Sequence, residues 1–153
     1  MTSRIEYWRV APEALRAIKG LDRYVHDCGL EHSLLELVKI RASQMNGCAY
    51  CLDMHTKDAR AAGETEQRLY VSSAWREAPF YTERERAALE WTEVVTDIGR
   101  HGVDEDVYQR TREHFTENEL VDLTMAVVTI NGWNRLAIAF SAEVGSYRPQ
   151  LAR

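Results

Sequence analysis

The chain has 153 residues, a formal net charge of −5 at pH 7 and a hydrophobic content of 45%. A chain of this length is most simply one domain, here residues 1–153. It buries roughly 68–70% of its unfolded surface, enough for a hydrophobic core that needs no disulfide or metal to stabilise it. The acidic balance, together with the lack of a basic tract, argues against nucleic acid as a partner.

No apolar run approaches the ~20 residues that a helix needs to span a bilayer, so we expect no membrane partner. The N-terminal segment has no apolar core followed by a small-residue cleavage site, and we predict no signal peptide. The expected location is the cytoplasm. The odd count of three cysteines, Cys28, Cys48 and Cys51, is unlike a secreted disulfide framework.

The apolar periodicity predicts an all-α, single-domain bundle of about six to seven helices, and the sequence carries no β-hairpin signal. Two helix starts are marked by capping boxes, in which Thr82 pairs with Glu85 and Thr116 with Glu119. We expect the tail after Gly145 to be loose. The expected helices cover about residues 13–27, 31–45, 48–62, 65–75, 82–98, 104–115 and 117–140.

A C-x-x-C-x-x-x-H motif, formed by Cys48, Cys51 and His55, follows directly after an Asn46-Gly47 turn signal. On a helix these three positions fall within about 60° of one another around the axis, so the three side chains share one face. Two thiols at this spacing can close into a disulfide and reopen, and a histidine can move the protons that this chemistry needs. We expect both cysteines in the first helical turn, where unpaired N–H groups and the helix dipole favour a thiolate.

Glu36 lies on the helix that precedes the Asn46-Gly47 turn. If this turn folds the two helices antiparallel, Glu36 lies ~15 Å before Gly47 along its axis and His55 ~12 Å after it, so the two sit nearly opposite each other. A carboxylate in that place fixes the tautomer of the imidazole and raises its basicity. On one continuous helix Glu36 would lie about 18 Å from Cys48, so the role of Glu36 depends on the hairpin.

A metal site is an alternative interpretation of the motif. Cys48, Cys51 and His55 supply three ligands, and Glu36 could be a fourth. Structural zinc usually takes its second pair of ligands from a distant segment, and the sequence has no second C-x-x-C and no H-x-x-x-H. We therefore expect no bound metal, and a purely structural cysteine pair is the other alternative.

The segment that leads into the motif resembles the alkylhydroperoxidase D-like branch of the carboxymuconolactone decarboxylase superfamily. The family pattern is a Glu, then eleven residues, then C-x-x-C-x-x-x-H, and Glu36 with the three motif residues matches all four positions. Residues 75–96 and 130–140 are also similar to parts of that family. The resemblance covers a family core of roughly residues 15–145.

The resemblance implies an all-α fold and a homo-oligomeric active unit (a trimer or hexamer), and we expect no cofactor. It implies a peroxidase that reduces hydrogen peroxide or organic hydroperoxides through a sulfenic acid and then a disulfide, which a dithiol of dihydrolipoyl or thioredoxin type reopens. By the same resemblance, Cys51 is expected to be the peroxidatic residue and Cys48 the resolving one, with Glu36 and His55 forming a proton relay. From the residues alone, the helix end favours Cys48 as the thiolate, whereas proximity to His55 favours Cys51.

The sequence departs from the family pattern at Tyr50. Some peroxidases of this group carry a second His just before the second cysteine, and a Tyr, with a pKa near 10, cannot relay protons at neutral pH as a His can. This departure bears on efficiency and on the reductant more than on the reaction class. Decarboxylases of the superfamily generally lack the cysteine pair, which argues against lactone decarboxylation here.

A non-enzymatic alternative is a thiol redox sensor or scaffold whose disulfide controls assembly or partner binding. The long apolar helix over residues 117–140 could form the interface that such a switch needs. We expect Trp133, Asn134 and Arg135 on this helix to serve core or interface packing, with a substrate channel as the alternative. Cys28 is expected to be a small buried apolar residue.

Overall fold

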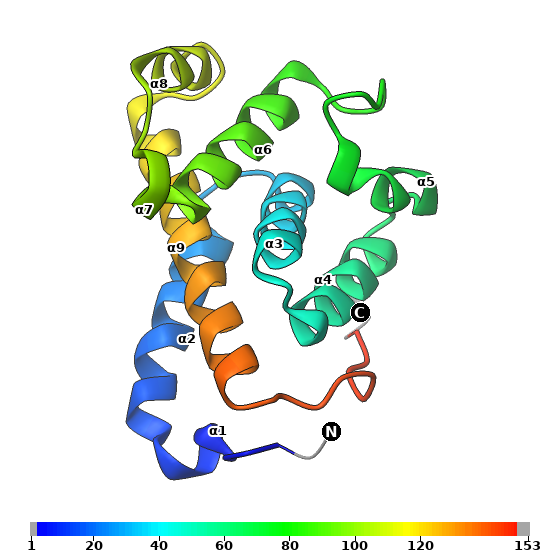
Figure 1. Ribbon diagram of the computed structural model, residues 1–153, viewed down its shortest axis with the longest axis vertical. Helices are drawn as coiled ribbons and strands as arrows, with labels where there is room; N and C mark the ends of the chain where they lie inside the picture. Colours follow the sequence, from blue (N-terminus) through cyan, green and yellow to red (C-terminus); the bar gives the residue numbers. More distant parts are fainter. Residues whose placement is uncertain (1–2, 150–153) are drawn as a thin grey trace.

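The computed structural model describes residues 3–149, and the secondary structure in that range is helical, with no strand. α3 lies at the centre and contacts α4, α6 and α9, while α2 packs along α9 (Figure 1). This arrangement confirms the predicted all-α bundle. The elements are α1 (Tyr7–Val10), α2 (Pro12–Asp27), α3 (His32–Asn46), α4 (Ala49–Ala61), α5 (Glu66–Tyr70), a 3₁₀ helix η1 (Ser72–Ala74), α6 (Glu83–Thr96), α7 (Ile98–His101), α8 (Glu105–Arg112) and α9 (Glu117–Ala139).

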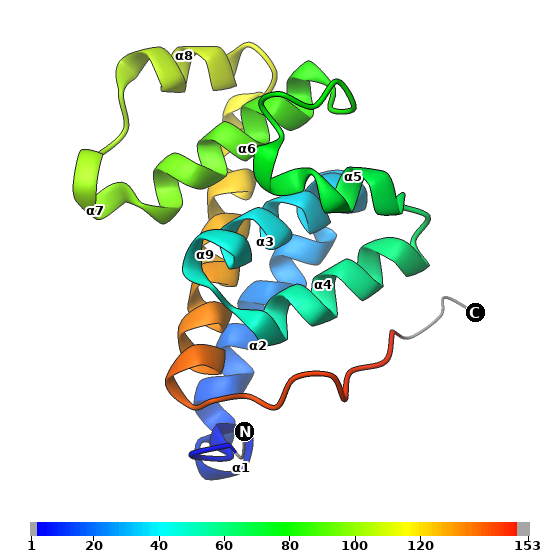
Figure 2. The ribbon, with the colours of Figure 1, turned by 45° about the vertical axis from the view of Figure 1, so that its right-hand side comes forward.

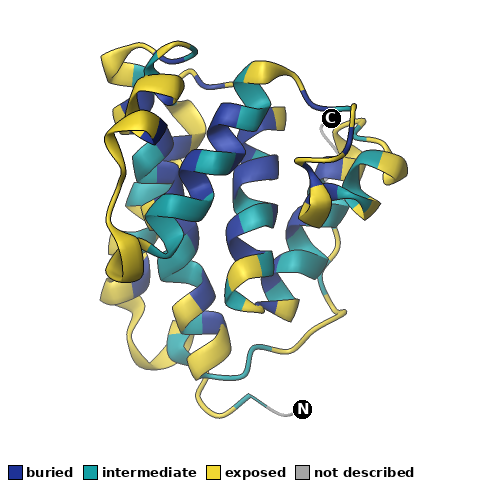
Figure 3. Ribbon diagram, turned by 45° about the horizontal axis from the view of Figure 1, so that its top comes forward, coloured by how far each residue is buried: buried dark blue, intermediate teal, exposed yellow. Residues whose placement is uncertain are grey.

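The largest apolar cluster fills the space where α3, α6 and α9 meet, with Val38, Trp91 and Leu123 among its buried members. Figure 3 shows buried residues along the facing sides of these helices and exposed residues on the outer elements. Each fully buried large aliphatic or aromatic side chain of this kind stabilises the fold by roughly 1.5–3 kcal/mol relative to its exposed state. Over residues 3–149, no helix combines the length and the apolar content that crossing a bilayer requires.

Both predicted capping boxes are confirmed. The Thr82 hydroxyl accepts a hydrogen bond from the Glu85 backbone N–H, and the Glu85 carboxylate accepts one from the Thr82 N–H at 2.8 Å. Thr116 and Glu119 form the same reciprocal pair at the start of α9. These caps satisfy backbone donors that the first turn of a helix leaves free, so α6 and α9 begin where the sequence predicts.

The described part of the chain contains nine α-helices, two more than the seven ranges given above. The additional ones are α1 and α7, which have four residues each and are too short to show a periodic pattern. The helix expected over residues 65–75 is divided into α5 and η1. The Ser72 hydroxyl donates to the Leu69 carbonyl at 2.8 Å, a local bond that competes with continued α-helix.

The expectation of a loose tail after Gly145 is wrong for Tyr147. The chain turns back after α9 and runs alongside α4 (Figure 2), where the Tyr147 hydroxyl and carbonyl both form hydrogen bonds with α4 side chains. These bonds are possible only because the end of α9 lies next to α4 in space. Residues 150–153 lie outside the described part of the chain.

Candidate active site

The site is built on the turn between α3 and α4. Gly47 adopts a left-handed conformation with φ of 68°, and the Cys48 N–H donates to the Ser43 carbonyl at 2.9 Å. This pattern, a left-handed residue just after the helix end and a bond back across the last turn, terminates α3 and reverses the chain. A residue with a Cβ adopts this conformation at a cost, so Gly47 allows the reversal that the position of Glu36 requires.

Cys48 and Cys51 are joined by a disulfide at the N-terminus of α4, with their Cα atoms 5.4 Å apart. Cys48 is the N-cap residue, and its sulfur accepts a hydrogen bond from the Cys51 backbone N–H at 3.3 Å. The prediction placed Cys48 in the first turn; the structure places it one position earlier, as the cap. This position still favours negative charge on sulfur, because the free N–H groups of the first turn point toward it.

His55 and Glu36 meet across the hairpin, as the antiparallel fold-back predicted. The Nδ1 atom of His55 lies 2.9 Å from Oε2 of Glu36, and Oε1 of Glu36 accepts a hydrogen bond from Lys39 at 2.8 Å. Both side chains are largely buried, with 9% of His55 and 17% of Glu36 exposed. With the Nδ1 proton donated to the carboxylate, Nε2 of His55 carries the free lone pair.

Glu36 is held in its ionised form. Burial alone would raise the pKa of this carboxyl group, but the hydrogen bond and charge of His55, and then those of Lys39, outweigh burial and lower its pKa to about 2. The carboxylate therefore stays an acceptor throughout the physiological range and fixes the orientation of the imidazole.

This pKa leads to a prediction for stability against pH. A carboxyl group whose pKa falls from 4.5 in the unfolded chain to about 2 in the folded one contributes stability above pH 4.5 that is lost as pH falls toward 2. We expect Glu36→Gln to lower the free energy of unfolding by about 3 kcal/mol at pH 6, and by less than about 1 kcal/mol at pH 2. Urea denaturation across this range measures the difference. Glu105→Gln, at an exposed carboxylate, is the control; a Glu36→Gln defect that does not change with pH would contradict the assignment.

Two residues of this neighbourhood were not predicted. Asp58 follows His55 by one turn of α4, and ligand atoms of Glu36, His55 and Asp58 all lie within 4.8 Å of one another. The Tyr147 hydroxyl donates to Oδ1 of Asp58 at 2.7 Å, and burial, followed by this bond, raises the pKa of Tyr147. The i,i+3 spacing from His55 could have identified Asp58. No sequence signal links Tyr147 to a site 89 residues away.

The residues that could bind a metal in the structure differ from the set considered from the sequence. Among residues 3–149, the group that could hold a cation is Glu36, His55 and Asp58, and it does not include the disulfide-bonded cysteines. Lys39 already supplies a positive charge to Glu36 at 2.8 Å. A divalent cation there would have to displace or repel this ammonium group, so the donor set fits a hydrogen-bonded relay better than a metal centre.

α9 closes the other side of the cysteine pair. Ile130 and Ala137 are buried in one apolar cluster with Cys48 and Cys51, and Trp133 packs against this cluster while partly exposed. This placement supports the packing interpretation of Trp133.

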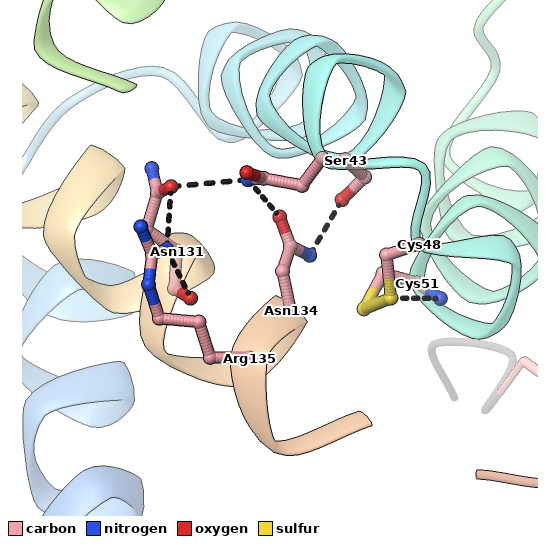
Figure 4. The surroundings of a disulfide bond; sticks show 7 residues. Ser43, Cys48, Cys51, Asn131, Asn134 and Arg135 are labelled. Atoms are coloured by element: carbon pink, nitrogen blue, oxygen red, sulfur yellow. Dashed lines mark hydrogen bonds between the residues drawn. A yellow bond between two sulfur atoms is a disulfide. The ribbon is translucent and has the colours of Figure 1, made fainter. Parts of the chain in front are cut away.

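An amide network centred on the buried Asn134 ties the α3–α4 turn to α9 (Figure 4). The Asn46 amide donates to the side-chain oxygens of Asn131 at 3.0 Å and Asn134 at 2.8 Å. Asn134 in turn donates to the Ser43 hydroxyl at 3.0 Å and is fully buried. Arg135 remains exposed and bonds back to Asn131. The network holds the turn that presents the cysteines.

We expect Asn134→Ala to lower the free energy of unfolding by about 2 kcal/mol, because it leaves the buried Ser43 hydroxyl and an Asn46 amide hydrogen without a partner. Urea denaturation followed by circular dichroism measures this loss. Gln109→Ala removes an exposed amide bond to Glu105 and should change stability by less than about 0.5 kcal/mol. Equal effects of the two substitutions would show that the network does not hold the turn.

Comparisons with known proteins identify the family of the chain. Residues 12–94 match the model of the carboxymuconolactone decarboxylase family. The chain is 44% identical to the uncharacterized protein YdfG of Bacillus subtilis (strain 168) over 146 residues, which is 95% of this chain and 99% of that protein.

Two solved structures share the fold. A protein of unknown function from Agrobacterium tumefaciens, ATU0492, provisionally named for antioxidant defence as AhpD, has a TM-score of 0.92 and 44% identity, over 95% of this chain and all of its own. The alkylhydroperoxidase AhpD core of a peroxidase-related protein from Ralstonia eutropha JMP134 has a TM-score of 0.80 and 22% identity, over 91% of this chain and 74% of its own. The chain therefore belongs to the carboxymuconolactone decarboxylase family, in its alkylhydroperoxidase D-like branch.

Proposed function

We propose that the protein is a thiol-dependent peroxidase that reduces hydrogen peroxide or organic hydroperoxides through a Cys48–Cys51 disulfide cycle. The observation that carries the proposal is the His55–Glu36 hydrogen bond of 2.9 Å, one helical turn beyond a disulfide-bonded cysteine pair. The antioxidant name given to the 44% identical Agrobacterium structure supports the same reaction class.

The proposed cycle begins with the reduced pair. Nε2 of His55 takes the proton of the Cys51 thiol, and the thiolate attacks one peroxide oxygen as the O–O bond breaks. The proton then passes to the departing oxygen, which leaves as an alcohol or as water, and Cys51 becomes a sulfenic acid. The Cys48 thiol attacks this sulfur and expels water, so that both electrons given to the peroxide come from the two thiols.

We assign attack to Cys51 because it lies one turn before His55, at a spacing that places both side chains on one face of α4. Cys48, at the cap, accepts the Cys51 N–H, which would hold its sulfur close to the sulfenic acid of Cys51. Tyr50 packs against the cysteine cluster and occupies the place where some relatives carry a His, so the relay here rests on His55 and Glu36.

We also propose that the reductant is a dithiol. Reduction of the Cys48–Cys51 disulfide requires two electrons, and the second thiol of a dithiol can resolve the mixed disulfide that the first thiol forms with the protein. We further propose a homo-oligomeric active unit, a trimer or hexamer. Apolar side chains that are exposed on α9, Val121, Val128 and Ile138, support such an assembly.

The test is a stoichiometric one. Fully reduced protein mixed with one equivalent of peroxide should lose two thiols per peroxide consumed, at a rate well above that of free cysteine. A panel of dihydrolipoamide, a thioredoxin system and glutathione, under one peroxide, then identifies the reductant. Thiols that react no faster than free cysteine would overturn the peroxidase.

A redox sensor would use the same disulfide. The cysteines pack against Ile130 and Ala137 of α9, so a change in redox state could alter an interface formed by α9. Sedimentation of oxidised and reduced protein distinguishes the two functions. A sensor should change its assembly or its binding with redox state, and a peroxidase should turn over without such a change.

A further inference from the structure

The disulfide of the proposed cycle is not accessible in this conformation. Cys48 and Cys51 are each only 1% exposed. Ala42, Ile130 and Ala137 cover them from the helical core, and the remaining cover includes Ala142, just beyond the end of α9. A reductant thiolate must reach one sulfur along the S–S axis, so some part of this cover has to move.

Residues 141–149, here called the strap, follow the end of α9 and lie outside the helices, and they contribute Ala142 to this cover. The strap begins where Ser141 adopts a left-handed conformation, with φ of 54°, and the Ala142 N–H donates to the Ala137 carbonyl at 2.9 Å. The end of α9 before it is fixed, because the Phe140 carbonyl accepts the Arg4 N–H at 2.9 Å. Ser141 is therefore a defined turning point between a fixed helix end and the strap.

The far end of the strap is held at Tyr147. Its hydroxyl donates to Asp58 at 2.7 Å, and its carbonyl accepts from Lys57 at 3.2 Å. Between these anchors, residues 143–146 are exposed and include Gly145 with φ of 97°. Few buried apolar contacts hold this stretch, as is usual for segments that open locally at low cost.

The two anchors of the strap lie at different positions along the proposed site. Ala142 contacts the cluster that contains Cys48 and Cys51, whereas Tyr147 binds Asp58, seven positions after Cys51 and about 10 Å farther along α4. His55 lies between them on the same face of the helix. The segment after α9 runs along α4 (Figure 2), with Ala142 at the cysteine cluster and Tyr147 at Asp58.

We propose that the strap is a lid over the redox site, latched by the Tyr147 hydroxyl on Asp58, and that its opening admits the dithiol reductant to the Cys48–Cys51 disulfide. This inference adds regulation to the proposed function and rests on it for its biological meaning. In the exchange, a reductant thiolate attacks one cysteine sulfur, the Cys48–Cys51 bond breaks and the other cysteine leaves as a thiolate. The second reductant thiol then attacks the reductant sulfur of the mixed disulfide and releases the remaining cysteine. The products are two cysteine thiols and the oxidised reductant, with both electrons supplied by the dithiol.

The experiment measures access and needs no peroxide. Oxidised protein is treated with tris(hydroxypropyl)phosphine, an uncharged reductant that converts the disulfide and one water into two thiols and a phosphine oxide. Acid-quenched samples are denatured and alkylated with a maleimide to follow the rate. Tyr147→Phe removes the latch hydroxyl and keeps the ring, and we expect reduction about tenfold faster than in the wild type, the scale of one hydrogen bond to a charged group.

Asp58→Ala and the double variant complete the test. Because the phosphine is uncharged, removing the Asp58 charge does not by itself change how strongly the reductant is attracted to the site. Each single variant should accelerate reduction to the same extent, and the double variant no further, if the two groups form one latch. Tyr24→Phe is the matched control, since its hydroxyl makes a 2.6 Å bond to Asp122 on another face of the molecule. Thermal melts verify that all variants are folded.

The lid proposal is contradicted if the disulfide of Tyr147→Phe is reduced at the same rate as in the wild type and in Tyr24→Phe. It is also contradicted if the rate increases of Tyr147→Phe and Asp58→Ala multiply in the double variant. Failure of the peroxidase proposal would appear separately, as slow reaction of reduced thiols with peroxide. Phosphine access reports on the strap in either case.

Discussion

Cys51→Ser should abolish peroxide turnover, with a rate loss of about a thousandfold or more, because a serine hydroxyl gives no thiolate to attack the O–O bond. The measurement is consumption of peroxide by the reduced protein, with an excess of a dithiol. Cys28→Ser is the control: its thiol donates to the Val25 carbonyl outside the site, so the variant should retain wild-type turnover.

Cys48→Ser separates attack from resolution. Without added dithiol, which would itself react with a sulfenic acid, this variant should consume one peroxide per chain and retain Cys51 as a sulfenic acid that dimedone labels and mass spectrometry detects. The reverse pattern, a single turnover in Cys51→Ser and none in Cys48→Ser, would assign attack to Cys48. Full turnover by both variants would contradict the disulfide cycle itself.

The second large effect is expected at His55. His55→Ala should slow the reaction of the reduced protein with peroxide by about 10²–10⁴-fold at pH 7, the usual contribution of a positioned general acid–base group. Stopped-flow mixing with peroxide measures this rate. His101→Ala, at an exposed histidine on α7, should react like the wild type.

The pH dependence distinguishes proton transfer from a structural role of His55. A free thiol ionises near pH 8.5 and is only about 3% thiolate at pH 7, so above pH 9 the thiolate forms without a base and the His55→Ala defect should shrink by about 30-fold. A defect of the same size at every pH would indicate damage to the fold of α4. A wild-type rate at pH 7 would remove His55 from the mechanism.

The parts of the site that could be predicted are those set by local chemistry. Gly47 marks the chain reversal, and the spacing of Glu36 and His55 around it places the two groups opposite each other without any tertiary information. The capping boxes fix the starts of α6 and α9 for the same reason, because both partners lie within four residues.

The contacts that could not be predicted join distant segments. Tyr147 meets Asp58 across 89 residues, and Asn134 meets Asn46 across 88, so neither pair leaves a pattern in the sequence. The path of the tail is not evident from the sequence, because residues near a terminus usually have few contacts, whereas the direction in which α9 ends decides which residues the tail can reach. The burial of both sulfurs likewise follows from helix packing and from the strap.

The shared carboxylate of Glu36 has a consequence for the net charge of the site. Lys39 contacts one oxygen of Glu36 and His55 the other, and the Asp58 carboxylate lies within 4.8 Å of Glu36 and His55. Moving a proton from the Cys51 thiol to the imidazole leaves the total charge of these side chains unchanged. The Cys51 thiolate can therefore form without uptake of an ion, and the resulting imidazolium lies against the Glu36 carboxylate. An uncompensated charge away from water would cost several kcal/mol.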